Sequence, residues 1–396
     1  MSWSALENNT VDPIRVAVIG AGHAGRGLAS YLSIHGFDVS LYNRTIANVE
    51  KISKRGGIKV HGLFDAFANL SLVTDDISKA IEDRDILIIV VPAQAHTFIA
   101  NSMVPHLKSG QTILLMPGRT GGALEFARFL RSHSYSDEIL LGEAQTYSFV
   151  SRITGLDSVL ISKVKNSTKA SAFPASHNRR FMRNLRRLPI TFNIADDVME
   201  TSLDNVGAML HPTPTILSAG LLESKEGGYN HYHDAISKSV GRLIERMDAE
   251  RISVAREFVS QPVSLLEWLR SSYDAEGTTL CECIQSIDAY DDVGSPSSLD
   301  HRYVLEDVPT GLVPISYIGR LAGVETPAID AMINMACQLY NYDFWSSGRN
   351  LGNLGLEGLN PSQVQEYVRT GVISEKYPEL YDHELPDVYR LEVDEI

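Results

Sequence analysis

The stretch Arg15-Val-Ala-Val-Ile-Gly-Ala-Gly-His-Ala-Gly25 decides the fold, because it carries an apolar run directly into three glycines. Gly20 permits a tight turn, Gly22 lets the backbone approach a pyrophosphate, and Gly25 lets a helix pack closely on the strand. The N-terminus of that helix would offer free N–H groups to the phosphates. The run before the glycines is typical of a buried parallel strand, and the segment after them is typical of a helix. The stretch therefore predicts a dinucleotide site, the alternative being a glycine-rich turn in another kind of α/β domain.

The residues that follow the second apolar strand, at 38–42, indicate which dinucleotide binds. A cofactor with a free ribose 2′-hydroxyl usually meets Asp or Glu at this point, but this chain has Asn43, Arg44 and Thr45. A guanidinium can pair with a 2′-phosphate, and a threonine hydroxyl can donate a hydrogen bond to it. The pattern favours NADP(H) over NAD(H). The alternative is that Arg44 is solvated and that Asn43 and the backbone hold the ribose.

Length, composition and charge exclude several classes of protein. The 396 residues, 44% of them hydrophobic and 21% charged, are typical of a globular chain of two domains. The longest apolar run, at 86–93, is too short to span a membrane, and the N-terminus lacks a secretory pattern. We therefore expect a cytoplasmic protein without a membrane partner. The net charge of -14 argues against a nucleic-acid partner, and a homodimer is expected because two-fold dimers are the commonest oligomers.

The cysteines predict neither disulfides nor a metal site. Cys281, Cys283 and Cys337 are too few and too irregularly spaced for a disulfide framework, and no histidines flank the Cys-x-Cys pair. We expect reduced thiols and no bound metal.

The two halves of the chain have different patterns of hydrophobic residues. Up to about residue 190, short β-rich runs alternate with helical stretches, which predicts a doubly wound parallel sheet. Beyond residue 196 the pattern changes to long amphipathic helices. We expect an α/β Rossmann domain over residues 1–195 and a mainly α-helical substrate domain over residues 196–396, which faces the nicotinamide across a cleft. The predicted elements are strands at 70–74, 85–92, 111–116 and 138–142, and helices at 77–81, 95–107, 122–131, 234–258, 264–273, 314–321 and 326–340.

Two of the predicted strands end in proline or glycine, at the edge where ligands bind in such sheets. Pro92 ends one strand, and the loop Met116-Pro-Gly-Arg-Thr-Gly-Gly122 follows another. We expect Pro92 and Gly118 to contact the cofactor. The alternative for this loop is a plain connection between a strand and a helix.

Two polar segments of the helical half carry groups suited to catalysis. His211 ends an apolar helical face, and the prolines after it are expected to break the helix. Arg302, Glu306 and Asp307 precede a proline–glycine turn. Taken singly, the histidine reads as structural and the acidic segment as a helix-capping loop. Together they offer a proton donor, a carboxylate to orient it and a cation for a substrate carboxylate, which an imine or ketone reductase needs.

The whole chain resembles the opine dehydrogenase family, the relatives of octopine and nopaline dehydrogenase. The resemblance is most specific in the helical half, at Asn205 to His211-Pro212 and at Glu306-Asp307-Val-Pro309. Relatives often read Thr-Gln-Thr-Leu-Pro-Tyr-Ala-Cys-Arg where this chain reads Ala-Gln-Thr-Tyr-Ser-Phe-Val-Ser-Arg152, so the family's substrate preferences do not carry over. The other matching motifs are the glycine turn, Pro117-Gly118 with Gly121-Gly122, Glu143 with Thr146 and Arg152, Asp248-Ala-Glu-Arg251, Phe344-Trp345 with Gly348-Arg349, and Leu354-Gly355-Leu356.

The resemblance implies a reaction and the residues that perform it. Such enzymes condense the amine of an amino acid with a 2-oxo acid and move hydride from the nicotinamide to the C=N carbon. The resemblance makes His211 the catalytic acid/base and Asp307 its carboxylate partner, which would fix the imidazole tautomer and favour its protonated form. It also implies that Arg302 and Asn205 bind substrate and that Thr146 contacts the oxo acid.

The leading hypothesis is therefore an NADPH-dependent opine dehydrogenase that joins an L-amino acid to a small 2-oxo acid such as pyruvate. A hydroxyacid-type or glycerol-3-phosphate-type dehydrogenase would share the first domain, but such reactions usually rely on a lysine in the helical domain. Between residues 196 and 307 this chain has only Lys225 and Lys238, and neither lies in a motif that reads as catalytic. A non-enzymatic nucleotide sensor would have no reason to combine His211, Asp307 and Arg302.

Overall fold

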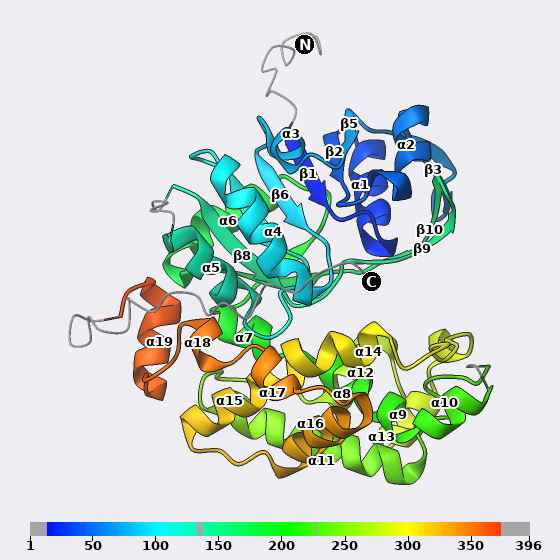
Figure 1. Cartoon of the computed structure of the whole chain (residues 1–396), viewed down its shortest axis with the longest axis vertical. Coiled ribbons are helices and arrows are strands. Elements are labelled where there is room, and N and C mark those ends of the chain that lie inside the picture. The colour runs from blue at the N-terminus through cyan, green and yellow to red at the C-terminus, as the bar shows by residue number, and fades with distance from the viewer. Residues whose placement is uncertain (1–13, 133–137, 226–227, 374–396) are drawn as a thin grey trace, which may run out of the picture.

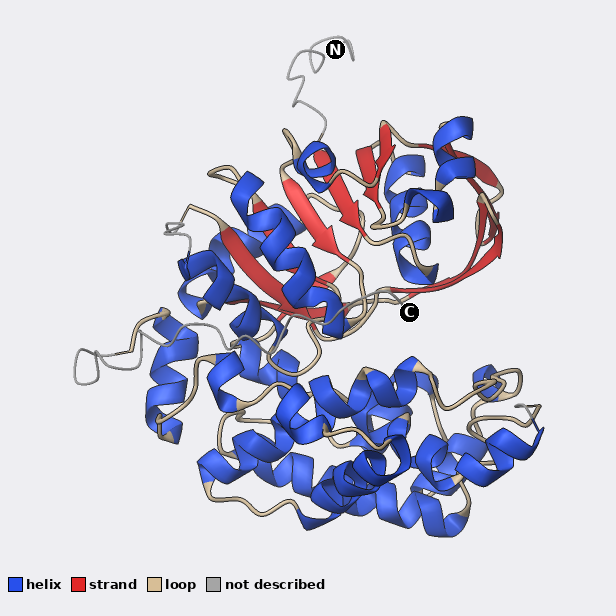
Figure 2. Ribbon diagram, in the orientation of Figure 1, coloured by secondary structure: helices blue, strands red, loops and turns tan. Residues whose placement is uncertain are grey.

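A computed structural model of the chain describes residues 14–132, 138–225 and 228–373, and it has a sheet-containing domain above a helical one (Figures 1 and 2). The main sheet has eight strands in the order β12-β11-β8-β7-β6-β1-β2-β5. All neighbours in it are parallel except β11 and β8, which are antiparallel. The strands are β1 (Arg15–Ile19), β2 (Asp38–Tyr42), β5 (Leu72–Thr74), β6 (Ile86–Ile89), β7 (Thr112–Leu115), β8 (Leu140–Ala144), β11 (Thr168–Phe173) and β12 (Phe192–Ile194).

The register of the parallel strands brings their carboxyl ends to one edge. Ile19 of β1 pairs with Tyr42 of β2 and with Ile89 of β6. The same row continues through Leu115 of β7 to Glu143 of β8. The glycine turn, the Asn43 segment and the loop after β7 therefore leave the sheet side by side.

Helices cover both faces of this sheet because side chains alternate between faces along each strand. Val16 and Val18 share a core with α1 and α6, whereas Ala17 and Ile19 share another with α3, α4 and α5. The predicted doubly wound fold is confirmed. The helices are α1 (His23–Ile34), α2 (Glu50–Arg55), α3 (Ile77–Ile81), α4 (His96–Met103), α5 (Gly122–Ser132) and α6 (Asn178–Leu185), with short helices η1 (Ile46–Asn48), η2 (Ala93–Ala95), η3 (Val104–His106) and η4 (Ala175–His177).

A second sheet was not predicted from the sequence. Its order is β4-β3-β10-β9, and its strands are β3 (Gly57–Gly62), β4 (Ala66–Asn69), β9 (Phe149–Gly155) and β10 (Ser158–Val164). Figure 1 shows β9 and β10 curving from beside α1 to the side of the first domain that faces the helical domain. The close approach of β9 requires a glycine in α1, because a Cβ on Gly27 would lie 2.4 Å from the Ser151 Oγ.

The second domain is helical, as expected, and is organised around the long helix α11. Its last two helices return to the first domain, where the Arg131 guanidinium donates to the Tyr367 hydroxyl at 2.6 Å. The division at residue 195 remains a proposal. The helices are α7 (Val198–Leu203), α8 (Gly207–Leu210), α9 (Pro212–Leu217), α10 (Ala219–Lys225), α11 (Lys238–Arg256), α12 (Leu265–Tyr273), α13 (Leu280–Gln285), η5 (Asp288–Tyr290), α14 (Arg302–Leu305), the π-helical turn η6 (Val308–Leu312), α15 (Val313–Ala322), α16 (Pro327–Tyr340), α17 (Phe344–Ser347), α18 (Leu351–Leu354) and α19 (Pro361–Thr370).

One local expectation for this domain is confirmed and one was wrong. The helix before His211 does end there, because α8 stops at Leu210 and Pro212 takes the first position of a separate helix, α9, where no backbone N–H is needed. The segment around Pro309 is the π-helical turn η6 rather than a proline–glycine turn. Pro309 lies near the start of that turn, where the missing N–H is tolerated.

The three cysteines are free thiols. Within the described ranges no helix has the length and apolar character needed to cross a membrane.

Candidate active site

The glycine turn fits a dinucleotide. Gly20 has φ +115°, and a Cβ there would lie 2.5 Å from the Val90 carbonyl oxygen, while a Cβ on Gly25 would lie 1.8 Å from the Gly20 oxygen. Gly22 differs, because nothing lies within 4 Å of an added Cβ. It is the N-cap of α1 and provides no side-chain cap for the N–H groups of the first turn. The turn thus leaves open space and uncapped donors where a pyrophosphate would lie.

The segment after β2 offers a cation and no carboxylate. The Arg44 side chain is exposed and lies over the Phe98 ring at 5.7 Å. Thr45 is also exposed, whereas the Asn43 amide donates to the Thr45 carbonyl at 2.8 Å and so shapes the turn. Pro92 is exposed, between β6 and η2. Their contacts with the cofactor remain predictions.

Glu143 explains the glycine at position 118. A Cβ on Gly118 would lie 2.2 Å from the Glu143 Oε2, so the carboxylate occupies the space of the missing side chain. Glu143 is fully buried and accepts hydrogen bonds from the Ala123 N–H and from the hydroxyls of Thr201 and Ser202. Its pKa is raised because burial outweighs these hydrogen bonds. The arrangement fastens β8 to α5 and α7, and it gives Gly118 a packing role besides its predicted contact with the cofactor.

The helical domain brings His211 and Asp307 together. The His211 Nδ1 lies 2.7 Å from the Asp307 Oδ2, although the residues are 96 positions apart. The Asp307 side chain is fully buried and the His211 side chain is 18% exposed. No partner of the His211 Nε2 is recorded among the described residues. The carboxylate can therefore fix the imidazole orientation while the other ring nitrogen remains available.

A neutral aromatic stack supports the imidazole. Tyr303 is stacked on His211 with ring centroids 4.3 Å apart and an angle of 16°. His231 lies on Tyr303 at 4.6 Å and is completely buried. Burial, followed by the charges of His211 and His301, lowers the pKa of His231 to about 3, so this ring stays neutral.

Arg119 joins the Asp307 carboxylate to the first domain and was missed in the sequence. Its Nε lies 3.1 Å from the Glu306 Oε1, and its Nη1 lies 3.4 Å from the Asp307 Oδ1. Asp307 Oδ1 accepts no hydrogen bond in the described part of the chain, so Arg119 is the charge that faces it. Burial alone would raise the pKa of Asp307, but Arg119, His211 and Arg302 outweigh it and lower that pKa to about 2. The carboxylate is thus held ionised.

Asn205 lies close to both Arg119 and His211. A Cβ on Gly207 would be 2.8 Å from the Arg119 Nη1, 3.4 Å from the His211 Cε1 and 3.5 Å from the Asn205 Oδ1. The Asn205 amide donates to the Thr120 hydroxyl at 3.2 Å. Asn205, Arg119 and His211 therefore surround one glycine, at the contact between the loop after β7 and the helical domain.

Arg302 lies close enough to both Asp307 and the glycine turn for its charge to act on each. Its Nε binds the Glu306 Oε2 at 2.8 Å, and its side chain is 38% exposed. Burial, and then the charges of Arg152, Arg26 and Arg302, lower the pKa of His23 in the glycine turn. Cations from both domains therefore gather near the turn, as anionic ligands require.

Thr146 lies apart from the dyad, in the loop after β8. Its hydroxyl accepts a hydrogen bond from the Lys165 ammonium at 3.1 Å. The pKa of the next residue, Tyr147, is raised by burial, and the charges of Glu306 and Arg302 also act on it. Thr146 therefore flanks the site without contacting His211 or Asp307.

Arg349 is a second buried arginine that sequence reasoning did not assign to the site. It is 2% exposed and donates to the Glu125 carboxylate and to the carbonyls of Gly118 and Thr120. The sequence signal for Arg349 was the Gly348-Arg349 motif, and the signal for Arg119 was its place in the loop Met116 to Gly122. The two arginines hold the loop after β7 against the helical domain.

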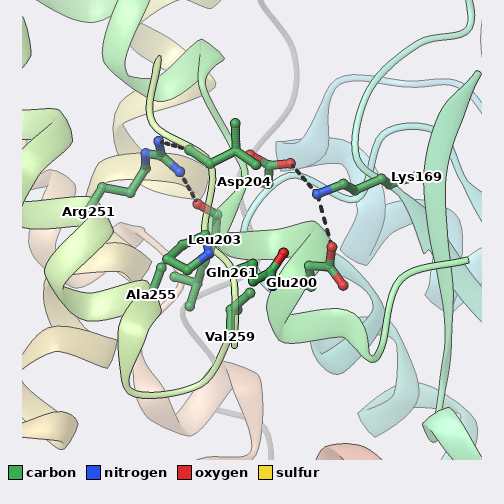
Figure 3. Close-up of a pocket in the computed structure, with 10 residues that line it drawn as sticks. Lys169, Glu200, Leu203, Asp204, Arg251, Ala255, Val259 and Gln261 are labelled. Carbon is green, nitrogen blue, oxygen red and sulfur yellow. Dashed lines mark hydrogen bonds and ion pairs between the residues drawn. The ribbon is translucent and has the colours of Figure 1, made fainter. Parts of the chain in front are cut away.

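A small pocket at the domain junction is separate from this site. Figure 3 shows Lys169 of β11 paired with Glu200 and Asp204, and Arg251 bonded to the Leu203 carbonyl. The Lys169 ammonium lies 2.9 Å from the Glu200 Oε1 and 3.3 Å from the Asp204 Oδ2. The ammonium of this pocket is paired by two carboxylates, so we assign it a structural role in joining the domains. Within the described ranges, no cluster of three metal-ligating side chains is present.

Comparisons with known proteins agree with this geometry. The family described as NAD/NADP octopine/nopaline dehydrogenase, alpha-helical domain, matches residues 194–340. The N-terminus of NAD-dependent glycerol-3-phosphate dehydrogenase matches residues 15–121. An opine dehydrogenase of Arthrobacter sp. (strain 1C) is 36% identical over 353 residues, which cover 89% of this chain and 98% of that protein.

Solved structures show the same fold. Octopine dehydrogenase in complex with NADH and agmatine superposes with a TM-score of 0.74 at 18% identity, covering 91% of this chain and 98% of that one. NADP+-bound yersinopine dehydrogenase gives a TM-score of 0.69 at 14% identity, covering 90% and 98%. The expected resemblance is confirmed, and the chain belongs to the opine dehydrogenase family of nicotinamide-dependent oxidoreductases that act on CH–NH bonds.

Proposed function

We propose that the protein is an NADPH-dependent opine dehydrogenase that joins an L-amino acid to a small 2-oxo acid such as pyruvate. The observation that carries the proposal is the buried Asp307 carboxylate 2.7 Å from an accessible imidazole, that of His211. This pair can donate a proton and take one back, which condensation of an amine with a ketone requires.

In this proposal, His211, Asp307 and Arg302 each have a separate role in the reaction. Protonated His211 donates from Nε2 to the oxygen of the condensing carbonyl, which leaves as water when the imine forms. Asp307 stabilises the protonated imidazole, and Arg302 holds a carboxylate of the substrate near the glycine turn. A bound reduced nicotinamide supplies the hydride that the C=N carbon accepts. The product is a secondary amine, with one water released per turnover.

The segment after β2 supports NADPH as the reductant. Arg44 is exposed and has no recorded carboxylate partner within the described residues, so a 2′-phosphate would meet an unpaired guanidinium above the Phe98 ring. Among the relatives, octopine dehydrogenase has been solved with NADH and yersinopine dehydrogenase with NADP+. The family therefore allows both cofactors, and Arg44 favours NADPH here.

The reaction is tested by following NADPH oxidation with pyruvate, with an amino-acid mixture, and with both. We expect turnover only with both, and we expect His211→Ala to lower kcat by roughly 100-fold or more while NADPH still binds. His106→Ala, at an exposed position, is the matched control. Full activity with pyruvate alone would show a simple ketone reductase and end the proposal.

The cofactor preference has its own test. Arg44→Ala should weaken NADPH binding by about 10- to 100-fold, as for a lost charge-assisted hydrogen bond, and should leave NADH binding nearly unchanged. Arg246→Ala, an exposed arginine of α11, serves as control. Equal losses for the two cofactors would remove Arg44 from the 2′-phosphate site.

A further inference from the structure

The proposed reaction brings two carboxylates into the cleft, one from the amino acid and one from the 2-oxo acid. Arg302 can hold one of them, but its Nε is already bound to the Glu306 Oε2 at 2.8 Å. Arg119 is committed to Glu306 and Asp307. The second carboxylate therefore needs another cation; Arg152, exposed near the glycine turn, is one candidate, and Lys165 is a more buried one.

Lys165 is a half-buried cation without a counter-charge. Its ammonium donates to the Thr146 hydroxyl at 3.1 Å, and within the described ranges it pairs with no carboxylate. The chain carries 49 acidic residues against 35 Lys and Arg, so an unpaired half-buried lysine is unexpected for this composition. Burial, followed by repulsion from Lys163, lowers the pKa of Lys165 to about 8. A desolvated ammonium of this kind is stabilised when an anion binds beside it.

The surroundings of Lys165 face the helical domain. Thr146 follows β8 at the carboxyl edge of the main sheet, and its neighbour Gln145 donates to the Asp204 carboxylate at 2.7 Å. On the other side, the Lys163 ammonium lies over the Tyr273 ring of α12 at 5.6 Å. Figure 1 shows the ends of β9 and β10 on this side of the first domain. Lys165 therefore lies between two points where the domains meet.

The loop also adjoins the catalytic network. The pKa of Tyr147, which follows Thr146, is raised by burial, and the charges of Glu306, Arg302 and Arg119 also act on it. Of the two neighbouring lysines, Lys169 is already neutralised by two carboxylates (Figure 3), and Lys163 is exposed and lies over the Tyr273 ring. Among the described residues, Lys165 is thus a largely buried cation of this part of the cleft that no carboxylate neutralises.

We propose that Lys165 and Thr146 form a binding site for a substrate α-carboxylate, the second anchor beside Arg302. The ammonium supplies the charge and the Thr146 hydroxyl a directed hydrogen bond, since a hydroxyl can donate to a carboxylate while accepting from the lysine. The assignment rests on the proposed function and adds to it a residue that the resemblance to the family did not supply. It also gives substrate binding a pH dependence. The cationic form of Lys165 is lost as the pH rises through about 8, and Lys163 is the charged neighbour that opposes protonation.

The test compares Lys165→Met with Lys165→Arg, using the exposed Lys59→Met on β3 as the matched control. Pyruvate binding to the enzyme–NADPH complex is measured by calorimetry, and KM is measured for pyruvate and for the amino acid separately, each with the other saturating. We expect Lys165→Met to raise the Kd or KM of one acid by about 10- to 100-fold, with kcat changed less than about 3-fold and Tm equal to that of the control.

The two acids and the pH profile give distinct outcomes. A change in pyruvate binding assigns the site to the 2-oxo acid, and a change confined to the KM of the amino acid assigns it to the amine substrate. In the wild type the affected KM should rise above about pH 8, and Lys165→Arg should bind normally and abolish that rise. An unchanged KM for both acids, or a loss of NADPH affinity alone, would overturn the proposal. The calorimetric arm needs no turnover, so it also distinguishes failure of this site from failure of the proposed reaction.

Discussion

Replacing Arg119 with methionine would test the electrostatic structure of the site most directly. Methionine keeps much of the length of the side chain but removes the charge that lies 3.1 Å from Glu306 and 3.4 Å from Asp307. Those carboxylates are 1% and 0% exposed. Without Arg119, Arg302 and His211 would remain as their cationic partners among the described residues.

The expected loss of stability follows from these distances. At an effective dielectric constant of about 20, a unit charge this close to a carboxylate contributes on the order of 5 kcal/mol. Desolvation of the guanidinium offsets part of that gain. Removing one partner of a buried ion pair typically costs about 3–5 kcal/mol. We therefore expect the free energy of unfolding of Arg119→Met to fall by that amount, with a decrease in Tm of roughly 5–15 °C.

The pH dependence has a definite sign. Against the effect of burial, Arg119 is the largest influence that lowers the pKa of Asp307, so its removal should raise that pKa. The acid limb of the kcat/KM profile, where Asp307 gains a proton and ceases to orient His211, should move to higher pH. Because the folded pKa of Asp307 is depressed, its stabilising effect is present above the unfolded value of about 3.9 and is lost as pH falls through the folded value. The stability difference between Arg119→Met and wild type should therefore shrink below about pH 4.

Thermal unfolding followed by circular dichroism between pH 3 and 8, together with pH–rate profiles, would measure both effects. Arg119→Lys should be intermediate, and Arg246→Met should match the wild type because Arg246 is exposed. The double variant Arg119→Met/Glu306→Gln should regain part of the lost stability, since one uncompensated carboxylate is gone. An Arg119→Met protein with wild-type Tm and an unmoved acid limb would refute the assignment.

The remaining predictions concern the glycine turn and a buried helix cap. Gly22→Ala should fold with unchanged Tm, because nothing lies within 4 Å of the new methyl group, yet bind NADPH at least about 10-fold more weakly in a fluorescence titration. Gly25→Ala should lower Tm, since its Cβ would lie 1.8 Å from the Gly20 oxygen; an unchanged Tm would show that the turn can shift. Asp197, whose pKa is raised to about 6 mainly by burial, is the N-cap of α7. Its folded pKa exceeds the unfolded value of about 3.9, so stability is lost as pH rises from about 4 to 6, and Asp197→Asn should be up to about 3 kcal/mol more stable than wild type at pH 8 and equal to it at pH 3.

The parts of the fold that could be predicted from the sequence are those encoded by local patterns. The glycine turn identified β1 and α1, and the helix predicted at 77–81 has those bounds in the structure because Asp76 caps it. The second sheet could not be predicted in this way. Its strand β10 pairs with β3, so that Leu160 lies opposite His61, nearly a hundred positions upstream. The short strand β3 carries no signal of that partner.

The same limit applies to the active site. The family resemblance pointed to His211 and Asp307, which the structure joins at 2.7 Å. Nothing in the sequence near Arg119 pointed to Glu306, which lies 187 positions away. Arg119 has φ +58°, a conformation that non-glycine residues rarely adopt. Only the tertiary contacts explain why an arginine is held in that conformation.

The loop after β7 constrains where substrate selection can occur. The Thr120 N–H donates to the Thr310 carbonyl, and the Gly121 N–H donates to the Ser202 hydroxyl, so the loop is bonded to the helical domain on two sides. Because Arg119 belongs to this loop, the dyad is held at a fixed position relative to the carboxyl edge of the sheet. Differences in substrate must then be accommodated by segments that are not fixed to the dyad. The loop after β8, with Thr146 and Tyr147 at its centre, is such a segment, and it lies where this chain departs from the usual family sequence.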